Sequence, residues 1–386
     1  MAGATGRIGS VLLELLSTRS DVWGEIRLAA APEEHGRRLT VRGEETELRA
    51  LDEDCFAGAD IALFALPKPL AARWAPIAVG NGCVVVDSSG AFRMHPEVPL
   101  VVPEVNAATA RLRPRGVVAG PRGTTPPLAV ALGALHAEFG LAELVLATYQ
   151  AASGAGESGV RRLRAQLSAV AVGQAAGQAP GTYPGDVRRA IGDLDEHGEP
   201  LRPEASGPEA AGAEAAGAEA PGADPDDAPL ALNVVPWCGR TEEDGWSSEE
   251  LGLREELRKI LGLPELKATA TCVRVPVVTG HSIAVHAVFA REVTVERAHR
   301  VLAEAPGVLV YDDPEQREFP TPVDVVGTDP AWVGRVRRSP DDPRALDFFL
   351  CADNLRKGGA LNLVQIAEAV CAEPAAATEP AAPGRP

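Results

Sequence analysis

The segment MAGATGRIGSVLLELL, residues 1–16, decides the fold that we expect for this chain. It places Gly3, Gly6 and Gly9 at every third position, and apolar residues at helical spacing follow over residues 8–16. Glycines here let the backbone turn sharply before a helix and approach a pyrophosphate, whose negative charge then faces the helix N-terminus. Alone this is a weak signal, because many glycine-rich turns before helices bind nothing.

The stretch that follows alternates strands with helices. Short apolar runs cover residues 26–30, 61–66 and 84–86, with helical stretches between them, and residues 101–102 form a further extended segment. Strands separated by helices indicate βαβ units and a parallel sheet. This context favours the dinucleotide-binding interpretation of the glycine turn over the purely structural one.

The glycine turn lacks the strand that should precede it. In a dinucleotide-binding fold this loop follows a buried strand, typically of ~5–6 residues. Only Met1 and Ala2 stand before Gly3. Either the natural start lies upstream of this methionine or the sheet lacks its first strand. The regular pattern of the rest of the domain favours the upstream start.

A second region with a different pattern begins near Gly120. The sequence TTPP at residues 124–127 precedes an apolar run, which predicts a helix with a threonine cap and proline in its first turn. Further expected elements are strands at 144–149, 268–278 and 283–289, a covering helix at 163–172 and a final helix at 361–371. The predicted fold class is therefore α/β: a Rossmann-type dinucleotide-binding domain plus an α+β domain with a mixed sheet.

Two segments lack large apolar residues. The acidic stretch 203–229 is rich in Ala, Gly and Pro, and the tail 373–386 has the same character. Neither can bury enough surface to offset its ordering entropy, so we expect a disordered insertion and a disordered tail. The rest is expected as a nucleotide-binding domain over 1–122 plus 352–372 and a catalytic and dimerisation-like domain over 123–351.

Composition limits the partners and the compartment. A formal net charge of −17 over 386 residues argues against nucleic acid or an anionic membrane. No apolar run is long enough to cross a bilayer, and the glycine-rich start leaves no room for a signal peptide. None of the six cysteines belongs to a CxxC pair, and Cys83 and Cys272 lie in apolar runs typical of buried thiols. We expect a cytoplasmic protein without a metal.

Seven motifs in a fixed order point to a family. They are GATGRIG, VDSSGAFRM, VPLVVPEVN, TYQAASGAG, NVVPW, VRVPVVTGHS and DNLRKGGALN. Together they resemble aspartate-β-semialdehyde dehydrogenase, from Gly3 to about Ala372 and outside the acidic insertion. The related N-acetyl-glutamyl-phosphate reductases share the plan but not this set. The resemblance implies a dimeric enzyme that makes aspartate semialdehyde from β-aspartyl phosphate and NADPH through a cysteine thioester.

The position of the family's nucleophile holds a glycine. The family carries its cysteine in an Asn-Cys-Thr-Thr segment at a helix N-terminus, a location that lowers a thiol pKa and offers N–H groups to an oxyanion. The matching residues here are Arg122, Gly123, Thr124 and Thr125. Glycine has no group with which to attack an acyl carbon, so no acyl-enzyme can form at Gly123. Arg122 replaces an asparagine that helps to bind phosphate in the family.

Other positions keep a residue that suits the family's chemistry. The resemblance implies that His281 is the acid/base and that Gln150 positions the acyl group or water. It gives Arg274 as the partner of the substrate carboxylate, for which a guanidinium fork is well shaped. It also gives Arg93 as a phosphate ligand and Glu249 as the ligand of the substrate ammonium.

Each of these residues has a structural alternative as well. A histidine beside a strand end is more often structural, but His281 lies within a matched motif. Arg274 lies in an apolar strand and needs an anionic partner, for which a ligand and an internal carboxylate carry equal weight. Glu249 fits a solvated helix face almost as well, and Gln150 could simply satisfy backbone groups.

The nucleotide contacts depart from the family pattern. The resemblance implies NADP as cofactor, with contacts from Gly3, Thr5, Gly6, Arg7, Ile8 and Asn354. After the second strand, however, Glu33 and Glu34 would repel a 2′-phosphate, although Arg37 and Arg38 could reach it. After the third strand, two prolines within residues 65–69 remove N–H donors. We therefore expect weakened cofactor binding, and the choice between NAD and NADP stays open.

The differences from the family lie at positions that carry its chemistry, while the motifs that form the fold are kept. They include Gly123 at the nucleophile position and Arg122 at a phosphate-binding position. Gly252 stands where the family has a phosphate-binding lysine. We therefore favour a family member inactive in the family reaction, which forms a homodimer or pairs with a paralogue. One alternative is altered, non-covalent chemistry on a small anionic metabolite. The other is a substitute thiol, either Cys272 or Cys238.

Overall fold

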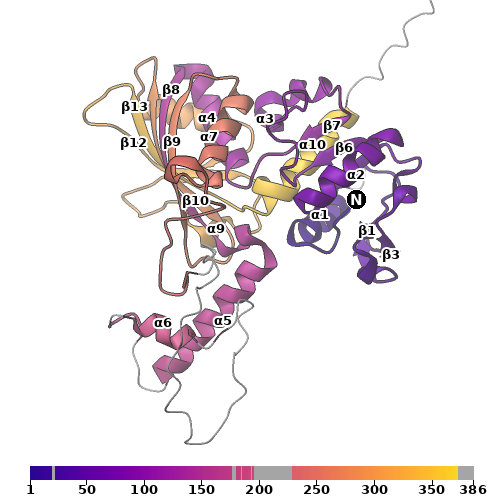
Figure 1. Ribbon diagram of the computed structural model, residues 1–386. Coiled ribbons are helices and arrows are strands. Elements are labelled where there is room, and N and C mark those ends of the chain that lie inside the picture. The colour runs from indigo at the N-terminus through magenta and orange to yellow at the C-terminus, as the bar shows by residue number, and fades with distance from the viewer. Residues whose placement is uncertain (20–21, 176–179, 184, 193, 195–227, 373–386) are drawn as a thin grey trace, which may run out of the picture. The chain divides into compact units, whose positions relative to one another are not determined.

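A computed structural model shows the chain as two compact units (Figure 1). It describes residues 1–19, 22–175, 180–183, 185–192, 194 and 228–372. The first unit comprises Met1–Arg122, Lys259–Gly262 and Gly359–Pro386, and the second comprises Gly123–Arg258 and Leu263–Gly358. The chain thus returns to the first unit at Gly359, later than the expected position 352.

The first unit is built on parallel strands. β5 (Ile61–Phe64), β6 (Val84–Asp87) and β7 (Val117–Ala119) form one parallel sheet in that order. β1 (Ala29–Ala30) pairs in parallel with β4 (Arg49–Ala50). The expected βαβ pattern is confirmed, because a crossover helix, α2 at residues 68–80, joins β5 to β6.

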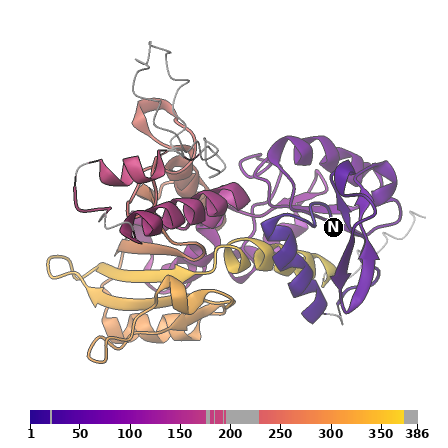
Figure 2. The ribbon, with the colours of Figure 1, turned by 90° about the horizontal axis from the view of Figure 1, so that it is seen from below.

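Helices α1 (Arg7–Thr18) and α10 (Leu361–Cys371) lie side by side in both ribbon views (Figure 1, Figure 2). Leucines of α1 and aliphatic residues of α10 share one buried apolar cluster, which explains why the helical spacing after the glycine turn is so regular. The unit also contains helices α2 (Lys68–Gly80) and α3 (Pro103–Asn106) and the hairpin of β2 (Arg38–Val41) and β3 (Glu44–Glu47).

β1 is much shorter than its sequence predicts. The apolar run covers residues 26–30, but only Ala29 and Ala30 are in strand conformation. A strand requires a neighbour, and the place beside β1 is taken only by Ala2, which makes isolated parallel bridges to Ala29 and to Phe64. The prediction of a longer strand was wrong, because among the described residues only Ala2 is bridged to β1 on this side.

The second unit contains one mixed sheet of six strands in the order β11-β12-β13-β10-β8-β9. β8 pairs with β9 and β11 pairs with β12 in parallel, whereas the other neighbours are antiparallel. The strands are β8 (Leu141–Gln150), β9 (Lys267–Arg274), β10 (His281–Phe289), β11 (Val308–Val310), β12 (Ala331–Arg338) and β13 (Ala345–Ala352). The predicted mixed sheet is therefore confirmed.

The two faces of this sheet differ in exposure. Leu146, Thr148 and Gln150 of β8 are buried, while Val145 and Tyr149 between them are 51% and 37% exposed. Strand residues alternate between faces, so one face is covered and the other is open in the single chain. Figure 1 shows α4 against the sheet. The helices are α4 (Thr125–Phe139), α5 (Gly156–Ala175), α6 (Asp186–Ile191), α7 (Ser248–Leu261), α8 (Val295–Glu304) and α9 (Pro322–Val325).

Some expectations fall outside the described residues. These are the tail 373–386 and the insertion 203–229, apart from Ala228 and Pro229. The expected strand 268–278 ends at Arg274, two residues before Pro276, whose ring cannot donate to a ladder. Within the described part of the chain, no helix combines the length and the apolar character needed to span a bilayer.

Candidate functional site

Gly123, which the family resemblance places at the nucleophile position, lies just before the first turn of α4. A Cβ placed on Gly123 would lie 3.5 Å from the backbone oxygen of Asn354 and 3.7 Å from that of Gly358, both ordinary contacts. Gly358 is different, because a Cβ there would lie 2.3 Å from the oxygen of Gly123. The fold therefore requires the glycine at 358 but would accept a side chain at 123.

Thr124, Gln150 and Glu249 meet beside this helix start. The hydroxyl of Thr124 donates to Oε1 of Glu249 at 3.1 Å, and Nε2 of Gln150 donates to the same oxygen at 3.3 Å. Thr124 precedes α4 as expected, but its side chain makes no cap hydrogen bond. The half-buried Glu249 is thus held by two donors, so a purely solvated helix face does not describe it.

His281 begins β10 and is buried with a defined tautomer. Its Nδ1 accepts the backbone N–H of Ala151 at 3.0 Å, so the neutral ring carries its proton on Nε2. Burial lowers the pKa of His281 to about 3, and the nearby positive charge of Arg274 adds to this effect. At neutral pH the imidazole is therefore uncharged and its Nε2–H is a hydrogen-bond donor.

Gly154 allows His281 and Arg274 to come close together. A Cβ on Gly154 would lie 2.8 Å from Nη1 of Arg274 and 3.3 Å from Nε2 of His281. No larger residue fits there without moving one of these side chains. Sequence reasoning did not single out Gly154, although it belongs to the quoted motif TYQAASGAG.

Arg274 is buried and pairs with no carboxylate in the ranges that the structure describes. Its Nη1 donates to the backbone oxygen of Ala151 at 3.0 Å, while its Nε has no hydrogen-bond partner. Arg274 is 9% exposed and lines a small cavity of about 30 Å³ with Leu230 and Trp237. Of the two partners considered for this arginine, the internal carboxylate is not found among the described residues.

Asn354 joins two loops of the second unit. Its Oδ1 accepts the N–H of Gly280 at 2.9 Å, and its Nδ2 donates to the hydroxyl of Ser153 at 2.9 Å. The side chain thereby fixes the turn before His281 against the segment that carries Gly154. The resemblance implies that Asn354 contacts the cofactor, and in this structure its side-chain amide makes hydrogen bonds within the second unit.

Two of the expected substrate-binding residues, Arg93 and Arg122, belong to the first unit. Arg93 donates through Nε to the backbone oxygen of Gly120 at 3.0 Å and through Nη2 to that of Ser88 at 2.8 Å. Arg122 is half-buried at the end of the same unit. The structure brings Gln150, Glu249, Arg274 and His281 together in the second unit with Gly123.

The three glycines of the turn before α1 have different structural roles. Gly3 has a φ of 89°, and a Cβ there would lie 2.3 Å from the oxygen of Ala65. A Cβ on Gly9 would lie 2.3 Å from the oxygen of Gly3, whereas at Gly6 the nearest such atom is 3.8 Å away. Gly3 and Gly9 are needed for packing, and Gly6 leaves space in front of α1. Arg7 and Ile8 are half-buried in its first turn.

Acidic charge lies beside this loop. The hydroxyl of Thr5 donates to Oε2 of Glu34 at 2.5 Å, and Nη1 of Arg37 pairs with the other oxygen at 3.2 Å. Arg38 pairs with Glu45 at 3.2 Å. Both arginines considered as 2′-phosphate ligands therefore already have carboxylate partners.

The two cysteines considered as substitute nucleophiles, Cys272 and Cys238, are both buried. Cys272 is fully buried beside Thr148, and this burial raises the pKa of its thiol far above the usual range. Burial also raises the pKa of Cys351 to about 12. Cys238 is 1% exposed. No metal-binding cluster of His, Cys, Asp and Glu occurs in the described ranges.

Comparisons with known proteins agree with this geometry. The NAD binding domain of semialdehyde dehydrogenases matches residues 1–112, and the dimerisation domain of semialdehyde dehydrogenases matches residues 132–357. The aspartate-semialdehyde dehydrogenase of Streptomyces akiyoshiensis is 39% identical over 375 residues, covering 97% of this chain and 98% of that protein. The corresponding protein of Synechocystis sp. is 36% identical over 366 residues, covering 95% of each chain.

A solved structure shares the whole architecture. It is the crystal structure of aspartate semialdehyde dehydrogenase II from Vibrio cholerae complexed with ASA, with 30% identity, a TM-score of 0.79 and coverage of 96% of each chain. The order of motifs, the two-part α/β fold and these matches along nearly the full length lead to one conclusion. The chain is a member of the aspartate-semialdehyde dehydrogenase family.

Proposed function

We propose that this chain is inactive in the thioester reaction of its family and retains the ability to bind a small anionic metabolite. The observation that carries the proposal is Gly123 at the nucleophile position. The thioester route needs a thiolate that displaces phosphate and holds the acyl group for hydride delivery. A glycine at the start of α4 offers only its backbone.

The remaining thiols support this proposal because they are poor substitutes. A thiolate is the attacking form, and burial in apolar surroundings disfavours it. Cys272 is fully buried with a raised pKa, and Cys238 is almost completely buried. Neither provides an accessible thiolate, so we consider a substitute thiol less favourable than the loss of covalent chemistry.

Metabolite binding is supported by Arg274 and Glu249. A buried guanidinium whose Nε has no partner among the described residues is costly unless an anion completes its hydrogen bonds. Glu249 offers a carboxylate within the same unit for a ligand's ammonium group. We propose a small molecule with a carboxylate and an ammonium group as the ligand class.

The second candidate function is non-covalent reduction or oxidation of a bound carbonyl compound. It is favoured by the neutral His281, whose Nε2–H can donate to a carbonyl oxygen and stabilise developing negative charge. A nicotinamide dinucleotide, when bound, would supply the hydride chemistry. In that case Arg274 would orient the substrate, while no residue would need to form a covalent bond.

We propose weakened dinucleotide binding as well. Gly3, Gly6 and the start of α1 resemble a pyrophosphate site, with Thr5 just before the helix and Arg7 and Ile8 in its first turn. The carboxylate of Glu34 at this loop disfavours the 2′-phosphate of NADP. Asn354 keeps its proposed link to the cofactor only if its present partners release it.

For the assembly we propose a homodimer or a heterodimer with a paralogue in the cytoplasm, with neither nucleic acid nor membrane as partner and no bound metal. The open face of the six-stranded sheet supports dimerisation, because Val145 and Tyr149 expose apolar surface there. A dimerisation domain is also what the family match over residues 132–357 suggests.

The decisive experiment combines an assay with a binding measurement. Purified protein receives aspartate semialdehyde, phosphate and NADP, and we expect no phosphate-dependent reduction of the nucleotide. Aspartate semialdehyde should nevertheless raise the melting temperature, since a ligand at about a hundred times its Kd stabilises by ~2.7 kcal/mol. Phosphate-dependent turnover would refute the loss of the family reaction.

The variants Arg274→Gln and Arg161→Gln separate specific binding from a general charge effect. Arg161 is an exposed arginine of α5. We expect Arg274→Gln to abolish the ligand-induced shift and Arg161→Gln to retain it. Absence of any shift in the unsubstituted protein would contradict the binding half of the proposal and leave the inactivity intact.

A further inference from the structure

The ammonium group of Lys259 holds an irregular loop of the first unit. Lys259 lies in the last turn of α7 and belongs to this unit. Its Nζ donates to the backbone oxygens of Arg93, His95 and Val98 at 2.8, 2.9 and 2.8 Å. An ammonium group has three N–H donors, so all of them are used on this loop. We call the three converging oxygens the carbonyl cradle.

The loop that forms the carbonyl cradle has little regular structure of its own. Residues 88–99 contain neither helix nor strand, and their hydrogen bonds span short distances in the sequence. The N–H of His95 donates to the oxygen of Phe92 at 3.0 Å, and that of Val98 donates to the oxygen of His95 at 3.2 Å. Carbonyl oxygens that converge in a part-buried place are unfavourable unless a donor lies between them. The closed form of the loop therefore depends on Lys259.

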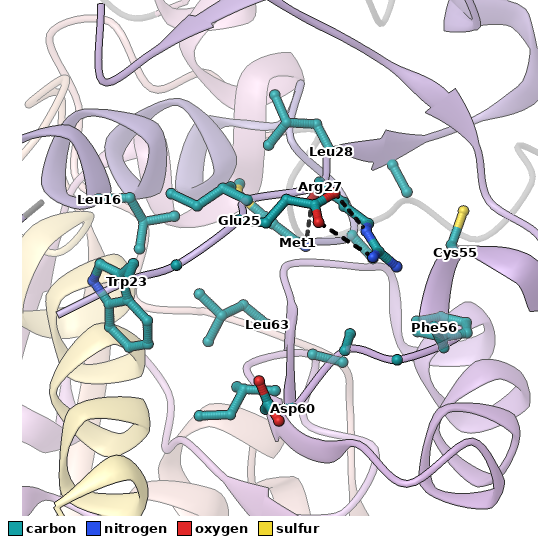
Figure 3. Close-up of a pocket in the computed structure, with 18 of the residues that line it drawn as sticks. Met1, Leu16, Trp23, Glu25, Arg27, Leu28, Cys55, Phe56, Asp60 and Leu63 are labelled. Atoms are coloured by element: carbon teal, nitrogen blue, oxygen red, sulfur yellow. Dashed lines mark hydrogen bonds and ion pairs between the residues drawn. The ribbon is translucent and has the colours of Figure 1, made fainter. Parts of the chain in front are cut away.

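Arg27 shows the more usual way to hold a cation in this unit. It lies beside a cavity of about 240 Å³ and pairs with the carboxylate of Glu25 at 2.9 Å, as Figure 3 shows. Lys259 has neutral oxygens instead, and burial lowers the pKa of its ammonium group. Charge-assisted hydrogen bonds to three carbonyls offset the lost hydration. These N–H donors, rather than an ion pair, thus hold the cradle together.

The guanidinium of Arg93 is held against the same loop. Its contacts to the oxygens of Gly120 and Ser88 fix Nε and Nη2. Gly90 has a φ of 84°, and a Cβ there would lie 3.1 Å from both Cζ and Nη1 of Arg93. The absence of a side chain at Gly90 lets the guanidinium lie close to the loop backbone. Because Lys259 holds the backbone oxygen of Arg93, opening of the carbonyl cradle would displace the guanidinium as well.

We propose that Lys259 is a positioning residue for Arg93: by closing the carbonyl cradle it keeps the guanidinium where it can bind a phosphate-like anion. This proposal rests on the expected role of Arg93 as an anion ligand. Lys259 acts through the loop, because its three donors are already used on backbone oxygens. Sequence reasoning did not single out Lys259, since the residues that it holds are more than 160 positions away.

The test compares Lys259→Met with Lys68→Met in the full chain. Methionine is similar in length to lysine but has no N–H donor, and Lys68 is an exposed lysine of α2 in the same unit. Exchange of the Nε–H of Arg93 is followed by NMR, and the Kd for inorganic phosphate is measured by titration calorimetry. Arg93→Gln assigns both the resonance and the phosphate site. Backbone amides of α1 report whether the first unit is folded.

We expect Lys259→Met to speed exchange of the Nε–H of Arg93 at least about tenfold and to weaken phosphate binding at least about fivefold, because the guanidinium loses its fixed place. Lys68→Met should change neither quantity. An unchanged exchange rate or an unchanged phosphate affinity in Lys259→Met would overturn the proposal. Phosphate binding that survives Arg93→Gln would overturn it as well. The ligand class proposed for Arg274 is judged separately, by the melting-temperature shift with aspartate semialdehyde.

Chemical rescue provides a second test, which applies also where Lys259→Met destabilises the first unit. Lys259→Ala leaves room for propylammonium, which supplies the missing carbons and the ammonium group. Tetramethylammonium is the matched control, because it carries the same charge without an N–H donor. We expect propylammonium to restore phosphate binding and slow exchange at Arg93, and tetramethylammonium to restore neither. Equal responses to the two cations would show that the hydrogen bonds of the carbonyl cradle do not position Arg93.

Discussion

The N–H of Ala151 donates to Nδ1 of His281 at 3.0 Å, and this one bond defines what the histidine can do. It places the single proton of the neutral ring on Nε2 and makes that atom a donor. A second proton would have to enter at Nδ1, where the N–H of Ala151 already points. The bond and the burial of the ring therefore both oppose the charged form, and the pKa is lowered to about 3.

The first prediction concerns stability against pH. In the folded chain burial lowers the pKa of His281 to about 3, from an ordinary value of about 6.5, so the neutral form belongs to the folded state. The neutral histidine therefore contributes to the free energy of unfolding. This contribution is fully present above pH 6.5 and is lost as the pH falls towards 3. Urea unfolding at several pH values should show a loss on the order of 3 to 5 kcal/mol over this window.

Two variants assign that loss to His281. His281→Asn keeps an acceptor near the N–H of Ala151 without a group that titrates, so its stability should depend less steeply on pH. His35→Asn changes an exposed histidine and should leave the slope as it is. An unchanged slope in His281→Asn would show that the histidine does not govern acid unfolding.

The second prediction concerns the close approach at Gly154. Gly154→Ala places a methyl group 2.8 Å from Nη1 of Arg274 and 3.3 Å from Nε2 of His281. One of the two buried side chains must shift, which we expect to cost about 1 to 3 kcal/mol of unfolding free energy. Gly80→Ala is the control, because a Cβ at Gly80 meets nothing within 4 Å. Equal stability of the two variants in urea would contradict the described packing.

The third prediction concerns Gly123 itself. Gly123→Cys should fold with nearly unchanged stability, since its Cβ would make only ordinary contacts at 3.5 and 3.7 Å. Gly358→Ala should be strongly destabilised, because its Cβ would lie 2.3 Å from the oxygen of Gly123. Urea unfolding of both variants tests this contrast.

The activity of Gly123→Cys tests whether features of the family's active site other than the nucleophile are also missing from this chain. We expect the new thiol to react with an alkylating reagent but to give little turnover of aspartate semialdehyde, since the family resemblance implies that Arg122 and Gly252 replace two phosphate-binding residues. Alkylation is followed by mass spectrometry and turnover by nucleotide absorbance. Robust turnover would mean that only the nucleophile separates this chain from an active enzyme.

The sequence predicted the architecture because its signals are local. The glycine spacing before α1 and the apolar runs of β5, β6, β8 and β10 each depend on neighbouring residues alone. The length of β1 could not be predicted in this way, because a strand also needs its partner. Among the described residues only Ala2 is bridged to β1 on this side, and residues 26–28 lie outside the strand although their sequence favours one.

The sequence motifs were enough to select Gln150, Glu249 and Arg274 as candidate site residues, but not to predict their interactions. No sequence pattern tells whether Arg274 contacts a carboxylate from a distant part of the chain. The hydrogen bond from Gln150 to Glu249 joins residues 99 positions apart. The importance of Gly154 likewise arises only when two distant side chains converge on it.

The fourth prediction concerns the nucleotide. Oε2 of Glu34 accepts the hydroxyl of Thr5 in the glycine loop, so a negative charge lies where the family resemblance implies a dinucleotide. We expect NAD to bind more tightly than NADP. Glu34→Gln should tighten NADP about fivefold, since removal of one repulsive charge at the surface changes the binding free energy by about 1 kcal/mol. The affinity for NAD should change much less, because NAD carries no 2′-phosphate.

Glu33→Gln is the matched control, since Glu33 is an exposed neighbour with the same charge, and we expect a smaller effect on NADP affinity there. Titration calorimetry of the unsubstituted protein and the two variants with both nucleotides measures the six affinities. Equal effects of the two substitutions on NADP would show that general charge rather than the position of Glu34 controls the preference.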